Sequence, residues 1–329
     1  MTKKTLPHIH ILAMGGTIAG RAASAEQTVG YRAGAIGIDE LLEAVPQVKD
    51  IAEITGETVA SIDSKDMTEP LMQKLAQRAS ECLQDEAING IVITHGTDTL
   101  EESAFFLSLL LSSAKPVVFT GAMRPATALS ADGPLNLLDA VRTAASGEAK
   151  NRGVLVVLNG SVHCASDVTK CDTARVDTFR SPNRGPVGST SGGHIHFFDK
   201  APVSPASTLF SFSSETLPEV SILYGHENET RFLTDALIEH GVKGIVYAGT
   251  GMGSISEAVL PALRSAQEKG IVVVRASRTG SGAVLPTEKY PLPFIAAGTL
   301  VPQKARILLQ LLLAKKMNPN EIQQAFNAY

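Results

Sequence analysis

The chain of 329 residues has no tryptophan, only 5% aromatic residues and three cysteines, and each scarcity excludes a class of function. With so few aromatic rings there is no platform on which nucleic-acid bases would stack. The net charge of -4 gives no electrostatic reason to expect nucleic acid or an anionic membrane as a partner. The three cysteines, Cys82, Cys164 and Cys171, form neither a disulfide framework nor a CxxC zinc site.

Long hydrophobic runs are also missing. No run approaches the roughly 20 residues of a membrane helix, and MTKKTLPHIHILAMGG lacks the continuous apolar region of a signal peptide. The expected compartment is the cytoplasm, or the periplasm if a signal peptide has been removed. The pairs His8/His10 and His194/His196 each fall on one side of a predicted strand, but no adjacent cluster of acids or cysteines accompanies them. We therefore expect no metal and no cofactor.

What the sequence does contain is an alternation of short apolar runs and helical patterns, which predicts an α/β fold. Several runs are rich in valine and isoleucine without alternation, as in parallel strands covered on both faces. Strands are predicted at 8–13, 90–94, 116–120, 153–158, 220–224, 244–248 and 270–275. Helices are predicted at 68–83 and 99–112, the second opening with the capping-box spacing of Thr99 and Glu102.

The segment Asp199–Pro218 is rich in serine and proline and has no clear period, which predicts a linker between two domains. A chain of 329 residues is also too long for one ordinary core. We expect a larger, flavodoxin-like catalytic domain at 1–200, a linker at 201–218 and a smaller α/β domain at 219–329. Each domain is expected to hold a mostly parallel sheet flanked by helices.

Small polar residues follow two of the predicted strands at their carboxyl ends, where sites form in open parallel sheets. The strand 8–13 runs into Gly15–Thr17, where glycines allow a sharp turn with exposed N–H groups; a plain tight turn is the alternative. The strand 90–94 runs into His95–Thr99 at a helix amino-terminus. That position suits a substrate carboxylate, and simple helix capping is the alternative.

These motifs resemble the signatures of bacterial type II L-asparaginases. The matching stretches are ILAMGGTIAG, VITHGTDTLEE, GAMRP, SADGPLNLLDAV, DVTK and LVPQKARILLQLLL. The resemblance runs from Leu6 to Tyr329, and the GGTIAG and HGTDT signatures together are highly specific. It implies an amidohydrolase that converts L-asparagine to L-aspartate and ammonia, with some glutaminase activity. It also implies a homotetramer of close dimers with active sites shared between subunits.

The resemblance assigns the catalytic roles. Thr17 is implied as the nucleophile, Tyr31 assists from the loop that follows, and Thr97, Asp98 and Lys170 form a hydrogen-bonded triad. The chemistry is coherent, because a threonine hydroxyl is a weak nucleophile that needs a partner to take its proton. Lys170 beside Asp98 would keep the network polarised while Thr97 relays protons or orients water. Backbone N–H groups of the turns would stabilise the oxyanion by about 3 kcal/mol each.

The substrate-binding roles are likewise implied by the resemblance. The α-carboxylate is expected at Ser64 and the HGTDT loop, with Gly16 and Gly96 supplying the two turns, and the α-ammonium is expected at Asp98. After Ser64 the family usually has glutamine or glutamate, but this chain has Lys65. A cation there would repel the ammonium by about 4 kcal/mol at ~4 Å and an effective dielectric near 20. The repulsion is relieved if Lys65 swings to solvent or pairs with a neighbouring aspartate.

Two further stretches bear on substrate recognition. Within SGAVLPTEKYP the family has a glutamate that the neighbouring subunit lends to the α-ammonium; Glu288 is the only acid there, and the gapless register puts Lys289 on that spot. Met14 also stands where threonine is usual. We therefore expect a weakened or altered preference for the α-amino group. In GTGMGSISEA, Ser254 is expected to approach the partner's active site, with a plain strand-to-helix turn as the alternative.

The same comparison with the family predicts that no disulfide forms at Cys82. The family cystine has one half at this position, but Ser113 stands roughly where the other half would be. Three rival functions stay open. The first is a glutaminase or amidotransferase-type amidase with the same nucleophile, and the second a non-catalytic amino-acid sensor. The third is a nucleotide-binding protein, which the GTGMGS loop suggests only weakly because Ser254 replaces its third glycine.

Overall fold

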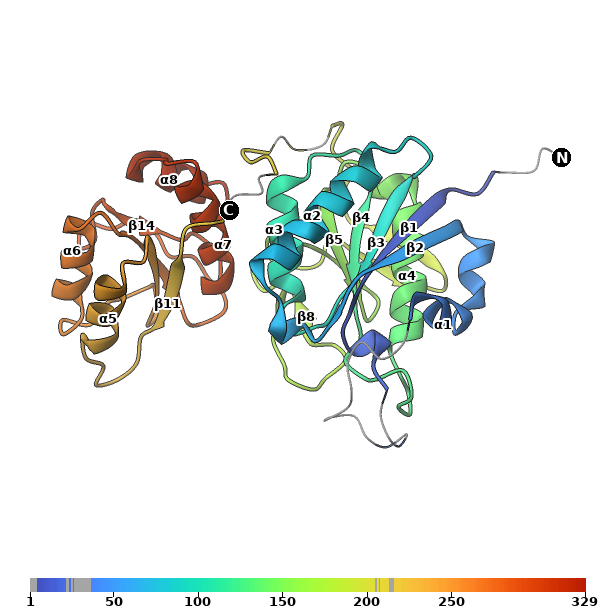
Figure 1. Cartoon of the computed structure of the whole chain (residues 1–329), viewed down its shortest axis with the longest axis horizontal. Helices are drawn as coiled ribbons and strands as arrows, with labels where there is room; N and C mark the ends of the chain where they lie inside the picture. The colour runs from blue at the N-terminus through green and yellow to red at the C-terminus, as the bar shows by residue number, and fades with distance from the viewer. Residues whose placement is uncertain are drawn as a thin grey trace. The chain divides into compact units, whose positions relative to one another are not determined.

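The computed structural model describes residues 5–21, 24, 26, 37–204, 206, 208–212 and 216–329. The chain divides into two compact units, residues 1–214 and 215–329, each built around its own sheet (Figure 1). The division falls within the segment 201–218 that the sequence predicts as a linker. Within the described residues, no helix is long and apolar enough to cross a membrane.

The first unit contains an eight-stranded sheet in the order β10-β9-β6-β5-β4-β3-β1-β2. Its parallel part comprises β1 (His8–Gly15), β2 (Glu53–Ile62), β3 (Gly90–Thr94), β4 (Val117–Thr120) and β5 (Val154–Leu158). The antiparallel part comprises β6 (Ser161–Cys164), β9 (Gly188–Ser191) and β10 (His194–Phe197). A separate two-stranded sheet pairs β7 (Thr169–Lys170) with β8 (Phe179–Arg180).

Helices cover both faces of this large sheet (Figure 1). One face packs on α1 (Ile38–Glu43) and α4 (Gly133–Ala145), whose apolar side chains form one core with residues of β1, β3, β4 and β5. The other face carries α2 (Glu69–Gln84) and α3 (Leu100–Leu110). Burial on both faces explains why these strands are continuous apolar runs. Short 3-10 helices lie at Thr17–Ala19, Pro46–Asp50, Ser64–Asp66 and Gly147–Ala149.

The second unit has four parallel strands in chain order: β11 (Val220–Tyr224), β12 (Gly244–Gly249), β13 (Val272–Ser277) and β14 (Phe294–Ala296). Its helices are α5 (Phe232–His240), α6 (Leu260–Glu268), α7 (Pro302–Ala314) and α8 (Pro319–Phe326). The predicted two-domain α/β architecture, with a mostly parallel sheet in each domain, is confirmed.

Most predicted elements are confirmed, but the capping box is wrong. Helix α3 does begin after Thr99, yet the Thr99 side chain makes no capping hydrogen bond. The Thr99 hydroxyl instead donates to the carbonyl oxygen of Ser64 at 2.7 Å. The Thr99 hydroxyl, which the sequence pattern predicts as a helix cap, therefore bonds Ser64, a residue that follows β2 and is distant in the sequence.

Candidate active site

The strand β1 ends in a turn that only glycine can make. Gly15 and Gly16 have φ angles of 89° and 78°, in the left-handed region that side chains disfavour. The N–H of Gly16 donates to the carbonyl oxygen of Ile62 at the end of β2, 3.0 Å away. A Cβ atom on Gly16 would lie 2.4 Å from the Cα of Gly96, so the turn after β1 touches the turn after β3 directly. Thr17, the next residue, is buried and opens a 3-10 helix.

The turn after β3 is locked to the end of β2 through Ser64. The Ser64 hydroxyl oxygen accepts from the N–H of Asp98 at 3.2 Å. A Cβ atom on Gly96 would lie 2.6 Å from that same oxygen. Three segments, following β1, β2 and β3, therefore meet at one edge of the sheet with backbone in contact. The structure brings Gly16, Ser64 and Gly96 together at the carboxyl ends of parallel strands, where the sequence predicts the site.

Lys170 joins this edge from β7. Its Nζ donates to Asp98 Oδ1 at 2.6 Å and to Thr97 Oγ1 at 3.0 Å. The Lys170 side chain is 17% exposed, whereas the Asp98 side chain is 55% exposed and Thr97 is buried. The ammonium thus links a buried hydroxyl to a carboxylate that reaches solvent. Such an arrangement can hold or move a proton at the Thr97 oxygen while leaving Asp98 open to a cationic ligand.

Glu101 is a site residue that the sequence reasoning missed. Its buried carboxylate Oε2 accepts from the backbone N–H of Lys170 at 2.6 Å. Glu101 lies in the first turn of α3, directly after the HGTDT loop. The backbone of Lys170 is therefore held by the helix that follows the loop whose Thr97 and Asp98 contact its ammonium. An acid at a helix amino-terminus has an ordinary dipole explanation, and no spacing in the sequence links it to Lys170.

His95 is fixed in a neutral, structural state. It is fully buried, and burial lowers its pKa to about 4. Its Nδ1 donates to the carbonyl oxygen of Gly96 at 2.8 Å, and the ring lies 6.0 Å from that of Phe119. An imidazole that stays uncharged at neutral pH and bonds its own loop is a support for the turn at Gly96.

Lys65 adopts one of the two arrangements expected to relieve its repulsion. Its Nζ lies 2.9 Å from Asp63 Oδ2 and 2.9 Å from Asp66 Oδ2. Hydrogen bonds to Asp66, and then to Asp63, raise the pKa of the Lys65 ammonium. The side chain is 61% exposed. Two carboxylates therefore neutralise the positive charge locally, and solvent screens what remains.

The other predicted site residues lie elsewhere. Tyr31 lies outside the described residues. Ser254 and Glu288 belong to the second unit, where Ser254 pairs with Thr250 in a turn after β12 and Glu288 lies on an exposed segment. Lys289 stands where the gapless register places the family glutamate, and its Nζ lies 3.4 Å from Glu257 Oε1. The expected approach of these residues to a partner's site stays a prediction.

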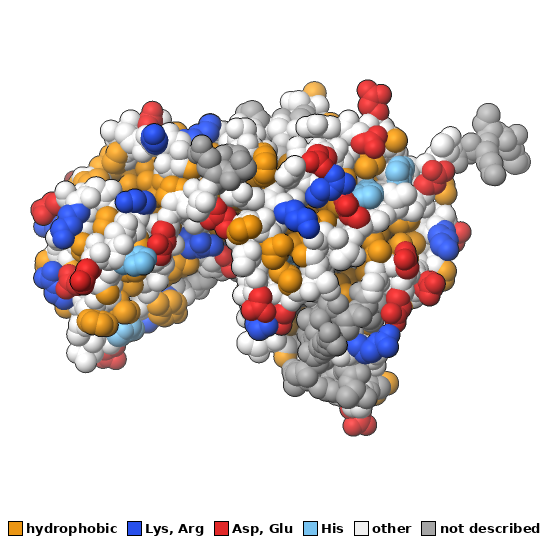
Figure 2. Space-filling view, in the orientation of Figure 1, with side chains coloured by type: hydrophobic (Ala, Val, Ile, Leu, Met, Phe, Trp, Pro, Cys, Tyr) orange, Lys and Arg blue, Asp and Glu red, His pale blue; other side chains and the backbone are white. Residues whose placement is uncertain are grey.

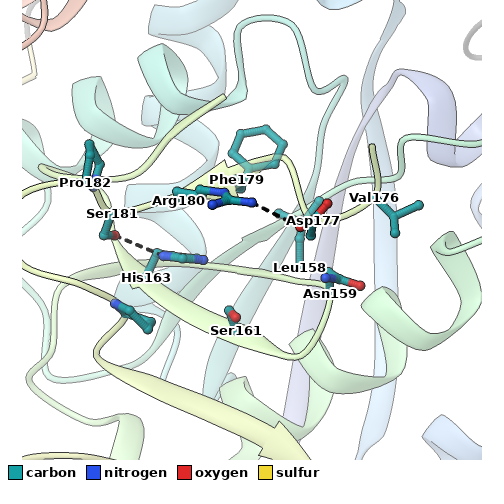
Figure 3. A pocket seen from close by; sticks show the side chains of 11 residues that line it. Leu158, Asn159, Ser161, His163, Val176, Asp177, Phe179, Arg180, Ser181 and Pro182 are labelled. Atoms are coloured by element: carbon teal, nitrogen blue, oxygen red, sulfur yellow. Dashed lines mark hydrogen bonds and ion pairs between the residues drawn. The ribbon is translucent and has the colours of Figure 1, made fainter. Parts of the chain in front are cut away.

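A separate cavity of about 540 Å³ opens beside β8 and the β5–β6 hairpin (Figure 3). His163 Nδ1 and Ser181 Oγ lie 2.9 Å apart in its wall, and Arg180 pairs with Asp177 at 3.1 Å. None of the predicted site residues lines it. We assign this cavity no part in the chemistry at the strand ends.

The glycine turns after β1 and β3 and the cluster of Lys170, Asp98 and Thr97 lie at the carboxyl ends of parallel strands, where α/β enzymes place their active sites. The chain belongs to the asparaginase family. Residues 8–203 match the model for the asparaginase N-terminal domain, and residues 219–326 match the glutaminase/asparaginase C-terminal domain.

Similar proteins span nearly the whole chain. It is 47% identical to L-asparaginase 2 of Bacillus subtilis, over 99% of this chain and 88% of that protein. It is 40% identical to the glutaminase-asparaginase of Pseudomonas fluorescens biotype A, over 100% of this chain and 92% of that protein. A crystal structure of a probable cytoplasmic L-asparaginase from Campylobacter jejuni matches with a TM-score of 0.94. That protein is 45% identical, with 98% of this chain and 100% of that chain covered.

Proposed function

We propose that this enzyme hydrolyses L-asparagine to L-aspartate and ammonia, with glutaminase activity on the side. The observation that carries the proposal is the contact between the Gly16 and Gly96 turns, because it sets the residue after each glycine, Thr17 and Thr97, at one edge of the sheet. Membership of the asparaginase family and the names of the similar proteins support the same reaction.

In the proposed first step, Thr17 Oγ1 attacks the carbonyl carbon of the substrate's side-chain amide. A carbon–oxygen bond forms, the threonine proton passes to the polar network, and the carbon–nitrogen bond breaks as the nitrogen leaves with a proton as ammonia. Water then attacks the acyl-threonine ester, which releases the carboxylic acid and restores the hydroxyl. Tyr31 is proposed to assist this exchange from the loop that follows Thr17.

The proposed relay runs through the lysine cluster. Thr97 Oγ1 exchanges a proton with water or with the leaving nitrogen while Lys170 Nζ, 3.0 Å away, polarises it. Asp98 holds the ammonium of Lys170 at 2.6 Å, so the positive charge of the lysine is balanced by a carboxylate that also reaches solvent. Glu101 holds the backbone of Lys170 and so positions the relay without touching the substrate.

We propose that the two charged ends of the amino acid are recognised at the same edge. Ser64 and the amino-terminus of α3 suit the α-carboxylate, because backbone N–H groups and the helix dipole favour an anion there. The exposed Asp98 carboxylate suits the α-ammonium by opposite charge. Because Lys65 is paired with Asp63 and Asp66, it repels the substrate's α-ammonium less than its position after Ser64 in the sequence suggests.

The proposed assembly is a homotetramer in which Ser254 and Glu288 of one subunit approach the active site of another. We propose the cytoplasm as the compartment, supported by three free cysteines and by the printed name of the Campylobacter jejuni protein. These assignments extend the family resemblance to this chain. Size-exclusion chromatography with light scattering tests the assembly, and activity at subunit dilution tests the shared site.

Ammonia release by the wild type and by Thr17→Ala and Thr17→Ser tests the reaction. We expect turnover of asparagine above that of glutamine, a loss of at least ~10³-fold in Thr17→Ala, and partial retention in Thr17→Ser. Faster turnover of glutamine would favour the glutaminase alternative. Binding of asparagine without any ammonia release by the wild type would favour the sensor, and turnover intact in Thr17→Ala would overturn the mechanism.

A further inference from the structure

Three side chains of metal-ligating type meet away from the active site, on β1, β2 and α2. His10, Glu57 and Cys82 each offer one ligand atom, and these atoms all lie within 4.8 Å of one another. The three residues are far apart in the sequence, so the histidine pair alone gives no sign of its companions. Figure 2 shows histidine side chains beside basic and acidic ones on this face of the first unit.

The hydrogen bonds around His10 leave its Nε2 lone pair without a donor. His8 Nδ1 lies 3.2 Å from the carbonyl oxygen of Ala87, which only accepts, so this nitrogen carries the proton. In the neutral ring, His8 Nε2 then accepts from the Thr55 hydroxyl at 2.7 Å. With its one proton committed, Thr55 Oγ1 accepts from His10 Nδ1–H, also at 2.7 Å. His10 Nε2 is therefore the unprotonated nitrogen.

That lone pair faces another acceptor. His10 Nε2 is buried and has no hydrogen-bond partner, and it lies 3.6 Å from the carboxylate oxygen Glu57 Oε1. Burial is also the main reason that the pKa of His10 is lowered, which favours the neutral ring. Buried polar atoms are nearly always satisfied, and a lone pair set against a carboxylate is unfavourable unless a proton or a metal cation lies between them.

The charges around the cluster call for such a cation. Arg78 Nε and Nη2 donate to Glu57 Oε1 at 2.9 and 2.8 Å, and Arg78 also bonds Glu81. Cys82 is a free cysteine that is 4% exposed, and burial raises the pKa of its thiol. Before a cation binds, the thiol keeps its proton, and the carboxylates of Glu57 and Glu81 face one guanidinium with an excess of one negative charge. A divalent cation that displaces the thiol proton would meet an excess of two negative charges and neutralise it.

We propose that His10 Nε2, a Glu57 carboxylate oxygen and Cys82 Sγ form a site for a zinc-class divalent cation. Zinc binds nitrogen, oxygen and sulfur at roughly 2.0, 2.1 and 2.3 Å, which sets tetrahedral ligand atoms about 3.5 Å apart. His10 Nε2 and Glu57 Oε1 are already 3.6 Å apart, and no pair of the ligand atoms is farther apart than 4.8 Å, so binding requires an approach of roughly 1 Å. On binding, the cation accepts three lone pairs, the Cys82 thiol releases its proton to solvent, and nothing is oxidised or reduced. Water takes the fourth position on the side of Glu57, which is half-buried.

The proposed cation joins two neighbouring strands and the helix that covers them, so its expected effect is on stability. Thr55 orients the imidazole and acts as a positioning residue, because its bond to Nδ1 fixes which nitrogen faces the cation. The site involves no residue of the proposed catalytic machinery. Activity therefore serves as a check that the fold of each variant is intact.

The test uses the full chain, stripped with a chelator and then titrated with ZnCl₂ by calorimetry and with CoCl₂ by absorption. We expect one ion per chain, a dissociation constant at or below the micromolar range, a thiolate-to-cobalt charge-transfer band in the near ultraviolet, and a rise in Tm with zinc. Cys82→Ser should abolish the band, and His10→Gln should weaken zinc binding at least tenfold. Thr55→Val keeps all three ligands and should weaken it by about tenfold or more.

Cys164→Ser and Cys171→Ser are the matched controls, because both remove a free thiol outside the cluster. They should leave the band, the affinity and the Tm rise unchanged. Activity and apo-state Tm identify any variant that fails to fold, and Glu57→Gln, in a strand at the sheet edge, then serves as the second ligand variant. Absence of saturable binding, or a band that survives in Cys82→Ser, would overturn the proposal.

Discussion

Replacing Lys170 with methionine removes the ammonium while keeping a side chain of similar length. Two bonds are lost, at 2.6 Å to Asp98 and 3.0 Å to Thr97. Hydrogen bonds to charged groups contribute about 1.5–3 kcal/mol each, so the pair gives about 3–6 kcal/mol if both bonds act fully in the transition state. Since 1.36 kcal/mol is a factor of ten in rate, kcat should fall by roughly 10²–10⁴-fold. This matches the range for the loss of a general acid–base group.

The assay is ammonia release from asparagine, coupled to NADH oxidation by glutamate dehydrogenase, with kcat and KM fitted separately. Lys74→Met is the matched control, because the Lys74 ammonium also makes a partly buried hydrogen bond, to the carbonyl oxygen of Val59 at 2.8 Å. The control should retain kcat within about twofold, and neither variant should lose its fold by circular dichroism. A Lys170→Met enzyme with kcat within fivefold of wild type would refute the relay.

Three further predictions test the surroundings of this cluster. Glu101→Gln weakens the support of the Lys170 backbone, so kcat should fall about tenfold with KM nearly unchanged; a change confined to KM would count against positioning. Lys65→Gln should change KM for asparagine less than fivefold, because Asp63 and Asp66 already neutralise the ammonium, and a fiftyfold decrease would contradict this. His95 has a folded pKa of about 4 against 6.5 unfolded, so its contribution to stability is complete above pH 6.5 and falls as pH drops toward 4. The loss should reach about 3 kcal/mol, measured by urea unfolding, and His95→Gln should flatten that slope.

The buried centre of each sheet could be read from the sequence, and the edges could not. β3 and β5 are uninterrupted apolar runs because helices cover both of their faces. β2 was not predicted, since it is an edge strand whose sequence EITGETVASI is mostly exposed and polar. The short strands β6, β9 and β14 were also missed, because three or four residues carry too little periodicity to be distinguished from loop.

The site divides in the same way. Groups carried by local motifs, such as the turn at Gly16 and the loop at Thr97, could be located from the sequence and the family resemblance. Contacts that depend on the tertiary fold could not: the Thr99 hydroxyl bonds Ser64 rather than its own helix, and Glu101 supports Lys170 from 69 residues away. A sequence pattern shows which hydrogen-bonding groups are present, but it does not show which distant residue each group bonds in the folded chain.

The main-chain contact between Gly16 and Gly96 has a consequence for how new specificities arise on this scaffold. Any side chain at either glycine would clash with the neighbouring segment and push apart the turns that carry Thr17 and Thr97, the proposed nucleophile and relay, so both positions are closed to variation. Lys65 and its flanking aspartates lie on the exposed rim and can be exchanged without moving either turn. Libraries that seek new specificities should therefore keep both glycines constant and place their substitutions at exposed positions such as 63, 65 and 66.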